Sequence, residues 1–574
     1  MPRFRSRYLV LIVSILVLLS GVILSSNVQN SFGTVIVTEE DFPDMEGAII
    51  HSTLQRPVYA TNSNPLPGVV VIHGSLQNKE WLMAFGIELA RRGFVVLTID
   101  ANGHGNSDPG NRTAGVAALE YLANLDFVDE SEMGLIGHSM GGGYVWSAVN
   151  QSTVTVDALV LVGAWVVNSS SVPYTPNTLV AVGDFSSLSS YPSNPTLLDP
   201  YFNVTGVEPG ITYGSFDDST ARRLILGRTN HLFETIEPVI VSESIDWMKE
   251  SLKDGVEDSY WLASSNLLYP LWLVGGFLSL VGAILTIFPL ISMLSELPVF
   301  ESLKGSPELG QGVSNREFLG KGALYGAIGV GTFFPFLAVG TILGFVIPFP
   351  QYYGLSVMSW MLGSGLVAAL ALYFIFGLKG ETGAFRKLAG MEEGLSKLLP
   401  SFIKSLVLAA IIIVWLYCWT LMVDVGLALD LRVFLPGFHD LTLRQALLVP
   451  LYFVVFLIYF AIEGMWLTGP LLTASKDTWV KTQIHWTVKA VVIKCIPYAL
   501  LIAFEYGGGL LTGASLVPGM IGFSFLFFYA FAPWFAVTTV IIMWSYRVTG
   551  NHYLGAILDG LICAWLLASI LSIR

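Results

Sequence analysis

The sequence predicts two joined parts, an α/β domain with a mostly parallel sheet and an all-α polytopic transmembrane domain. The chain of 574 residues is 53% hydrophobic and 12% charged, whereas soluble proteins contain about 25% charged residues. Residues 27–260 hold 28 acidic and 10 basic residues, and the rest of the chain holds 14 acidic and 19 basic ones. Strand-like and helix-like runs alternate in the acidic part, while long apolar runs recur outside it.

Residues 1–26 form the first apolar segment, which is expected to be a transmembrane anchor or a signal segment. Its apolar run, residues 8–24, follows Arg3, Arg5 and Arg7, and this order is typical of both kinds of segment. Because no A-x-A cleavage site follows, we expect an uncleaved anchor. Either interpretation places the following residues outside the cytoplasm.

Residues 261–574 contain eight further apolar runs, each with the ~20 residues that a helix needs to cross a bilayer. We expect spans near residues 267–292, 322–348, 353–377, 404–427, 446–468, 488–506, 517–545 and 554–572. With the N-terminus in the cytoplasm, fifteen Lys and Arg residues fall in cytoplasmic segments and three in the short outer segments. This asymmetry follows the positive-inside rule. It predicts an integral protein of the cell membrane whose residues 27–260 are extracytoplasmic.

The extracytoplasmic segment is expected to fold as alternating strands and helices. Expected strands are 33–37, 46–50, 68–73, 94–100, 133–137, 157–162, 178–183 and 222–226, and expected helices lie around 79–92, 113–125, 140 onward and 238–252. The first two strands are short and form an antiparallel edge. The others are almost continuously apolar, which is typical of a parallel sheet covered by helices on both faces.

A G-x-S-x-G motif lies where one of these strands meets a helix, at Gly137-His-Ser-Met-Gly141. A sharp turn at this point exposes the serine oxygen, and the flanking small residues let the chain bend without clashes. The start of the following helix also directs the N–H of Met140 toward a developing oxyanion. Ser139 is therefore the candidate nucleophile.

With this motif, the segment resembles the α/β-hydrolase family over residues 33–255. Two further blocks carry the resemblance, His73-Gly-Ser75 after the third strand and Asp100–Ser107 after the fourth. The resemblance implies a serine hydrolase with the chain order Ser, acid, His. It also implies an oxyanion hole made by the N–H groups of Met140 and Ser75, with Leu76 as an alternative donor.

His231 is the candidate general base. It follows the last predicted strand, and it is the only histidine between residues 139 and 438. A histidine at this place would take the proton of Ser139 and later return it to the leaving group.

The acid of the triad is the least determined residue. The family commonly places it three residues beyond a Gly at the end of the strand that corresponds to residues 178–183, where this chain has Ser186. We predict Asp184, the nearest carboxylate, as the acid. Asp217 and Asp218 remain alternatives, and so does a missing acid, which would point to a degenerate enzyme.

The cover of the active site is a second departure from the family. Only about fifteen residues separate the strands at 157–162 and 178–183, and hydrolases often insert a lid domain there. We therefore hypothesise that the membrane domain or residues 185–220 cover the site.

Three ionisable residues fall inside predicted spans, namely Glu463, Lys494 and Asp559. Each lies about six residues from the inner end of its helix, a depth of roughly 9 Å. Equal depth predicts a cluster, which would hold helices together or mark a proton or substrate path. Lys494 could alternatively extend to the membrane surface.

Together these features predict a membrane-embedded serine hydrolase that cleaves an ester, thioester or amide by a Ser-His-Asp mechanism. Its substrate would be a small molecule, a lipid or a peptide, and membrane lipid its other partner. A transporter or receptor with a degenerate hydrolase domain is the main alternative, and an acyltransferase the third. We expect no cofactor and no metal, because the sequence has neither a nucleotide-binding loop nor metal-ligand spacing, and no nucleic-acid partner, because the net charge is −13.

Overall fold

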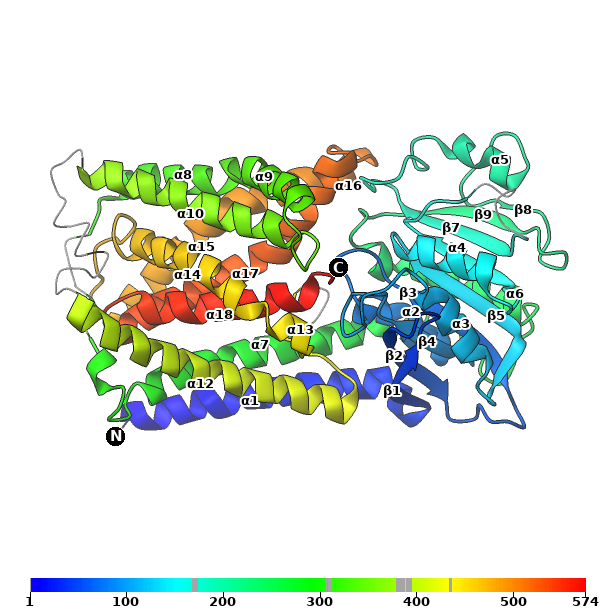
Figure 1. Cartoon of the computed structure of the whole chain (residues 1–574), viewed down its shortest axis with the longest axis horizontal. Coiled ribbons are helices and arrows are strands. Elements are labelled where there is room, and N and C mark those ends of the chain that lie inside the picture. Colours follow the sequence, from blue (N-terminus) through cyan, green and yellow to red (C-terminus); the bar gives the residue numbers. More distant parts are fainter. Residues whose placement is uncertain are drawn as a thin grey trace.

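A computed structural model describes residues 2–167, 174–305, 307, 312–377, 388, 395–432 and 436–574. An α/β domain lies at one end of an elongated helical domain (Figure 1). The α/β domain extends from Val35 to Leu252. The helical domain consists of α1 (Pro2–Gln29) and all elements from α7 (Tyr269–Leu294) onward.

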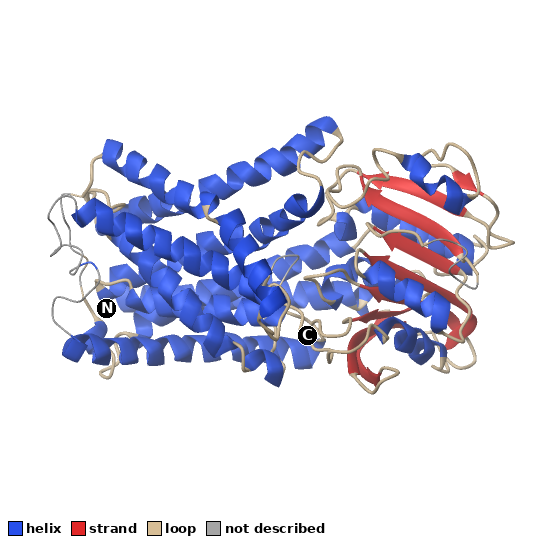
Figure 2. Ribbon diagram, turned by 45° about the horizontal axis from the view of Figure 1, so that its top comes forward, coloured by secondary structure: helices blue, strands red, loops and turns tan. Residues whose placement is uncertain are grey.

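The α/β domain is built on a nine-stranded sheet, drawn in red in Figure 2. Its strands are β1 (Val35–Pro43), β2 (Ile49–Pro57), β3 (Leu66–Ile72), β4 (Val95–Ile99), β5 (Val128–His138), β6 (Ala158–Val162), β7 (Asn177–Gly183), β8 (Thr212–Tyr213) and β9 (Arg222–Gly227), in the order β1-β2-β4-β3-β5-β6-β7-β9-β8. The six strands from β4 to β9 in that order pair in parallel, while β1, β2 and β8 are antiparallel. The predicted mostly parallel sheet is confirmed, and β8 is an added edge strand.

Successive residues of the buried strands point to opposite faces of this sheet. Helices therefore cover both faces. The helices are α2 (Met83–Ala90), α3 (Ala114–Ala123), α4 (Gly141–Gln151), the short α5 (Asp199–Phe202) and α6 (Pro238–Leu252). Val70 of β3 belongs to the core with α3 and α4, and Val71 belongs to the core with α2 and α6. The second core continues into the helical domain through Tyr269 and Trp272 of α7. The two domains therefore share one apolar interior.

Nine helices in the described residues are long and apolar enough to cross a membrane. They are residues 6–29, 269–294, 315–346, 354–376, 398–427, 443–468, 479–512, 519–549 and 553–570, and each overlaps one predicted span. Their elements beyond α1 and α7 are α8 (Asn315–Gly331), α9 (Phe333–Val346), α10 (Gly354–Gly377), α12 (Leu395–Leu427), α13 (Leu443–Ala446), α14 (Val449–Thr468), α15 (Trp479–Ile502), α16 (Gly508–Thr512), α17 (Gly519–Thr549) and α18 (Tyr553–Ile570). The predicted helical half is confirmed.

A buried polar network joins the two domains and fixes the face that the α/β domain presents. Arg432, which lies between α12 and α13, contacts Asp430 and places its Nη2 2.7 Å from Oε2 of Glu80. His439 Nδ1 lies 2.9 Å from Asp430 Oδ1. Close to the C-terminus, the N–H of Ile573 donates to the carbonyl of Gly103 at 2.6 Å. The Arg432–Glu80 ion pair and the hydrogen bond from Ile573 to Gly103 cross between the two domains.

Candidate active site

The turn between β5 and α4 holds Ser139 in a conformation that few residues adopt. Its φ is +51°, in the left-handed region that a non-glycine residue enters at a cost. The neighbouring glycines make the turn possible: a Cβ on Gly141 would lie 2.2 Å from the carbonyl oxygen of Ile72, and one on Gly137 would lie 2.7 Å from that of Gly141. The result is an elbow that pushes the Ser139 side chain out of the sheet.

His231 lies directly opposite this serine. Its Nε2 is 2.9 Å from Oγ of Ser139, and the residue is 5% exposed. His138, the second residue of the elbow, stacks beside the His231 ring with centroids 5.0 Å apart. Nδ1 of His138 lies 2.9 Å from Oε1 of Gln77, so His138 supports the site and does not face the nucleophile.

The carboxylate that meets His231 is Glu234, three residues further along the chain. Its Oε2 lies 2.9 Å from Nδ1 of His231 and 3.3 Å from Nε2 of His138. Its Oε1 accepts the N–H of Gly183 at 2.9 Å. Burial of this carboxyl raises its pKa, but the two neighbouring imidazoles outweigh that effect and hold the pKa of Glu234 at about 2. Glu234 is therefore a carboxylate across the physiological pH range.

Gly163, just beyond β6, leaves room for this carboxylate. Its φ is +55°, and a Cβ there would lie 1.9 Å from Oε2 of Glu234 and 2.9 Å from Nδ1 of His231. Only glycine fits both the conformation and the space. The approach of Glu234 to His231 thus depends on this position.

Asp184, the predicted acid, does not reach His231, and this prediction needs correction. Its N–H donates to the carbonyl of Gly227 at 2.8 Å. Burial raises the pKa of Asp184. The residue comes directly after β7, and among the described residues the ion pair of His231 is with Glu234.

The other predicted acids also lie elsewhere. Asp218 accepts hydrogen bonds from Thr220 in an exposed turn, and the N–H of Asp217 donates to Ser215 in the same turn. Ser186, at the family's usual acid position, places Oγ 3.4 Å from Nδ1 of His231. A hydroxyl therefore occupies the usual place of the carboxylate, and Glu234 approaches from the following 3-10 turn (Glu234–Ile236).

The predicted oxyanion donors surround the mouth of the elbow. Met140 is the N-cap of α4, so its N–H lies at the positive end of that helix. Ser75 and Leu76 line the same cavity as Ser139, and Leu76 has a φ of +61°. In the described residues, the N–H groups of these three residues donate to no other group, which leaves them available for a substrate oxygen.

His138, His231 and Glu234 are also the group that could hold a metal ion. One ligand atom from each lies within 4.8 Å of the others. However, Nε2 of His231 faces Ser139 and its Nδ1 faces Glu234, which is the arrangement of a nucleophile, a base and an orienting acid.

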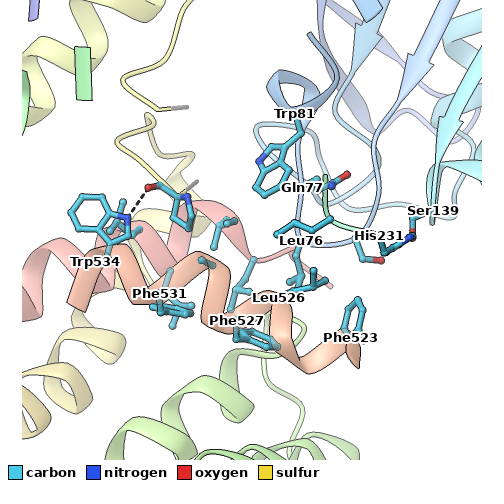
Figure 3. Close-up of a pocket in the computed structure, with 18 of the residues that line it drawn as sticks. Leu76, Gln77, Trp81, Ser139, His231, Phe523, Leu526, Phe527, Phe531 and Trp534 are labelled. Carbon is cyan, nitrogen blue, oxygen red and sulfur yellow. Dashed lines mark hydrogen bonds between the residues drawn. The ribbon is translucent and has the colours of Figure 1, made fainter. Parts of the chain in front are cut away.

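The helical domain covers the cavity at Ser139 (Figure 3). The space between its walls, together with the part that is open to solvent, is about 870 Å³. The α/β domain contributes Ser75, Leu76, Gln77, Trp81, His138, Ser139, His231 and Leu232, and the helical domain contributes Pro436, Phe523, Leu526, Phe527, Ala530, Phe531, Trp534, Cys563, Leu566, Leu567, Ile570 and Leu571. We hypothesised that either the membrane domain or residues 185–220 cover the site. The residues that line the cavity identify the helical domain as the cover.

The loop that carries His231 also packs on this cover. Nδ2 of Asn230 lies 3.3 Å from Oη of Tyr529 and 3.4 Å from Oε2 of Glu505. Phe233 packs edge-on against Tyr529 at 5.4 Å between ring centroids. Glu505 lies in a π-helical turn, Ala503–Gly507, a feature found frequently at functional sites. The helical domain therefore contacts the loop of His231 as well as covering the cavity.

The predicted intramembrane cluster is only partly assembled. Nζ of Lys494 lies 2.7 Å from Oε2 of Glu463, and Thr539 donates to Oε1 of Glu463 at 3.4 Å. Asp559 is fully buried, and neither of its oxygens has a hydrogen-bond partner among the described residues. The three residues were predicted to lie at the same depth, but among the described residues only Glu463 and Lys494 of this cluster form an ion pair.

Sequence reasoning missed Glu234. The available signal was the serine at position 186, which requires the acid to come from elsewhere, together with the His-x-x-Glu spacing of residues 231–234. A 3-10 turn directly after His231 brings that glutamate back beneath the imidazole.

Comparisons with known proteins match this architecture. Residues 63–191 match a family model described as serine aminopeptidase, S33. The chain is 27% identical to a bis(hydroxyethyl) terephthalate hydrolase of Streptomyces coelicolor over 201 residues, which is 34% of this chain and 60% of that protein. It is 25% identical to cutinase 2 of Thermobifida cellulosilytica over 203 residues, 33% of this chain and 71% of that one. It is 30% identical to lipase 1 of a Moraxella species over 137 residues, 23% and 42% respectively.

The chain thus spans less than two thirds of the terephthalate hydrolase that it resembles.

Proposed function

The α/β domain belongs to the α/β-hydrolase family, and we propose that the chain is a membrane-embedded serine hydrolase with the triad Ser139, His231 and Glu234. The observation that carries the proposal is the line of contacts from Ser139 Oγ to His231 Nε2, 2.9 Å, and from His231 Nδ1 to Glu234 Oε2, 2.9 Å. Ser139 lies at a strained strand-to-helix turn, and Ser139 and His231 both line a cavity.

The reaction follows from these positions. Oγ of Ser139 attacks the ester carbonyl carbon, and its proton passes to Nε2 of His231. Glu234 stabilises the imidazolium that forms, and the N–H groups of Met140 and Ser75 receive the oxyanion. The tetrahedral intermediate expels the alcohol, which takes the proton from Nε2. Water then repeats the sequence on the acyl-enzyme and releases the carboxylic acid.

Esters are the substrates that the comparisons support best. The names of the relatives, a terephthalate hydrolase, a lipase and a cutinase, are those of enzymes that act on esters. The family model that matches residues 63–191 is named for an aminopeptidase. Hydrolysis of an amide should therefore be assayed beside hydrolysis of an ester. The alternative of a transporter or receptor with a degenerate hydrolase domain drew on the uncertain acid and on the intramembrane charges. The carboxylate of Glu234 beside His231 supports the enzyme instead.

We place the catalytic domain outside the cytoplasm. The support is the charge asymmetry of the loops and the fact that α1 leads directly from the N-terminus into the sheet. Protease treatment of intact cells, compared with inverted vesicles, tests this placement: the acidic domain should be cleaved only in intact cells.

A fluorophosphonate probe tests the proposed activity. We expect the full-length wild-type protein in detergent to form one covalent adduct, and we expect Ser139→Ala to lose it. A folded wild-type protein that is never labelled would refute the proposal, and so would labelling that persists in Ser139→Ala.

A further inference from the structure

We propose that the part of the active-site cavity formed by the helical domain is a binding site for one long acyl chain, with the ester carbonyl of that chain at Ser139. This inference rests on the proposed hydrolase function and names its substrate class. The polar groups of the cavity, on Ser75, Gln77, His138, Ser139 and His231, all come from the α/β domain. The helical domain contributes apolar residues and Cys563. A ligand that fits is therefore polar at one end and apolar along its length.

The apolar part is a seam between α17 and α18. Phe523, Phe527, Phe531 and Trp534 of α17 line it, and their spacing of four, four and three residues places them on one face of the helix. Residues 563, 566, 567 and 570 of α18 line it with the same periodicity. Two facing apolar stripes of this kind form a channel that runs along the helices.

The length of the channel matches a long chain. Figure 3 shows Phe523 next to His231, with Phe527, Phe531 and Trp534 following along α17 away from the triad. At 1.5 Å per residue, the eleven steps from Phe523 to Trp534 rise about 16.5 Å along the helix. One leaflet of the hydrocarbon core of a bilayer is about 15 Å thick, which is the room that one lipid acyl chain takes.

The far end of the channel is closed. Nε1 of Trp534 donates to the carbonyl of Pro436 at 2.7 Å, and Trp534 is 3% exposed. This bond fixes the indole across the end of the seam. The channel therefore sets an upper limit on chain length.

The near end of the channel lies beside an apolar outer surface. Met520 and Ile521, which precede Phe523 on α17, are 68% and 59% exposed. On a helix that is long and apolar enough to cross a membrane, exposed apolar residues mark a surface for contact with lipid. An acyl chain in the adjacent leaflet is thus next to the mouth of the channel, and the membrane is the source that we infer.

Chain-length selectivity of the full-length enzyme tests the inference. With p-nitrophenyl esters from butyrate to palmitate, we expect kcat/KM to rise by up to about fourfold per methylene, the ratio that follows from burying one CH₂. Ala530 lies in the middle of the seam, roughly 10 Å from Phe523 along the helix. Ala530→Trp should lower the palmitate-to-butyrate ratio of kcat/KM at least a hundredfold. Ala532→Trp, on the same helix outside the cavity, should leave that ratio unchanged.

A second variant covers the case in which Ala530→Trp does not fold. Trp534→Ala removes the closed end and should move the preferred ester to chains longer than palmitate. An unchanged chain-length profile in both folded variants would overturn the acyl site. A folded Ser139→Ala variant that still hydrolyses butyrate would instead overturn the proposed function, so the two failures are distinguishable.

The carrier of the chain is identified with two substrates, phosphatidylcholine vesicles and palmitoylglycerol. Release of palmitate from either one supports the proposal and identifies the alcohol part of the ester. Release from neither, while the wild type hydrolyses p-nitrophenyl butyrate through Ser139, contradicts it.

Discussion

Replacing Glu234 with glutamine tests the assignment of the acid, because the structure dictates how the amide must sit. The N–H of Gly183 donates to Oε1 of Glu234 at 2.9 Å, so the amide oxygen of the glutamine has to take that place. Its NH₂ group then faces Nδ1 of His231, which becomes an acceptor. The imidazole proton moves to Nε2, and Nε2 no longer accepts the proton of Ser139.

The expected loss is large. Changing the triad acid to its amide lowers kcat about 10⁴-fold in a serine hydrolase of known mechanism. We expect a 10³- to 10⁴-fold loss of kcat for Glu234→Gln, which corresponds to about 4–5.5 kcal/mol of transition-state stabilisation. The assay is hydrolysis of p-nitrophenyl butyrate, with thermal unfolding as a check of the fold. Asp184→Asn is the matched control and should stay within threefold of the wild type.

A rescue variant makes this test sharper. Ser186 already places Oγ 3.4 Å from Nδ1 of His231, so an aspartate there would bring a carboxylate to the usual acid position of the family. We expect Glu234→Gln with Ser186→Asp to recover at least tenfold over Glu234→Gln alone. Activity within tenfold of the wild type in a folded Glu234→Gln variant would refute the assignment, as would a large loss in Asp184→Asn.

Three other predictions follow from buried contacts. Gly163→Ala should reduce kcat at least a hundredfold in the p-nitrophenyl assay, because its Cβ would displace the acid by more than 1 Å. Glu463→Gln should destabilise the protein by about 3–5 kcal/mol in thermal unfolding, since the ammonium of Lys494 stays buried; replacing both residues with leucine should cost less. Contact with Glu39 raises the pKa of His51 to about 9 despite its burial, so this contact stabilises the fold fully below pH 6.5. The free energy of unfolding should fall by about 3 kcal/mol as the pH rises through 9. His51→Gln should remove that pH dependence.

The sequence was sufficient for the features that depend on local patterns. Apolar runs located nine helices, because a membrane span needs only length and apolarity. The G-x-S-x-G motif located the strained turn at Ser139, because the required conformation restricts the residues around it. His231 followed from its place after the last long strand.

Features that depend on packing could not be predicted in this way. Glu234 reaches His231 because Gly163, far away in the chain, lacks a side chain. The cavity joins Ser139 to Phe531 and Leu567, and no local pattern links segments so far apart. Asp559 has the same depth as Glu463, but depth does not fix the direction in which a helix turns a side chain, and the two carboxyls make no hydrogen bond with each other.

An experimental structure of the full-length protein inhibited with a hexadecyl fluorophosphonate tests the central claim most directly. The account predicts phosphorus bonded to Oγ of Ser139, with the alkyl chain running between α17 and α18 toward Trp534. An unmodified Ser139, or a chain that leaves the site without entering the seam, would contradict it.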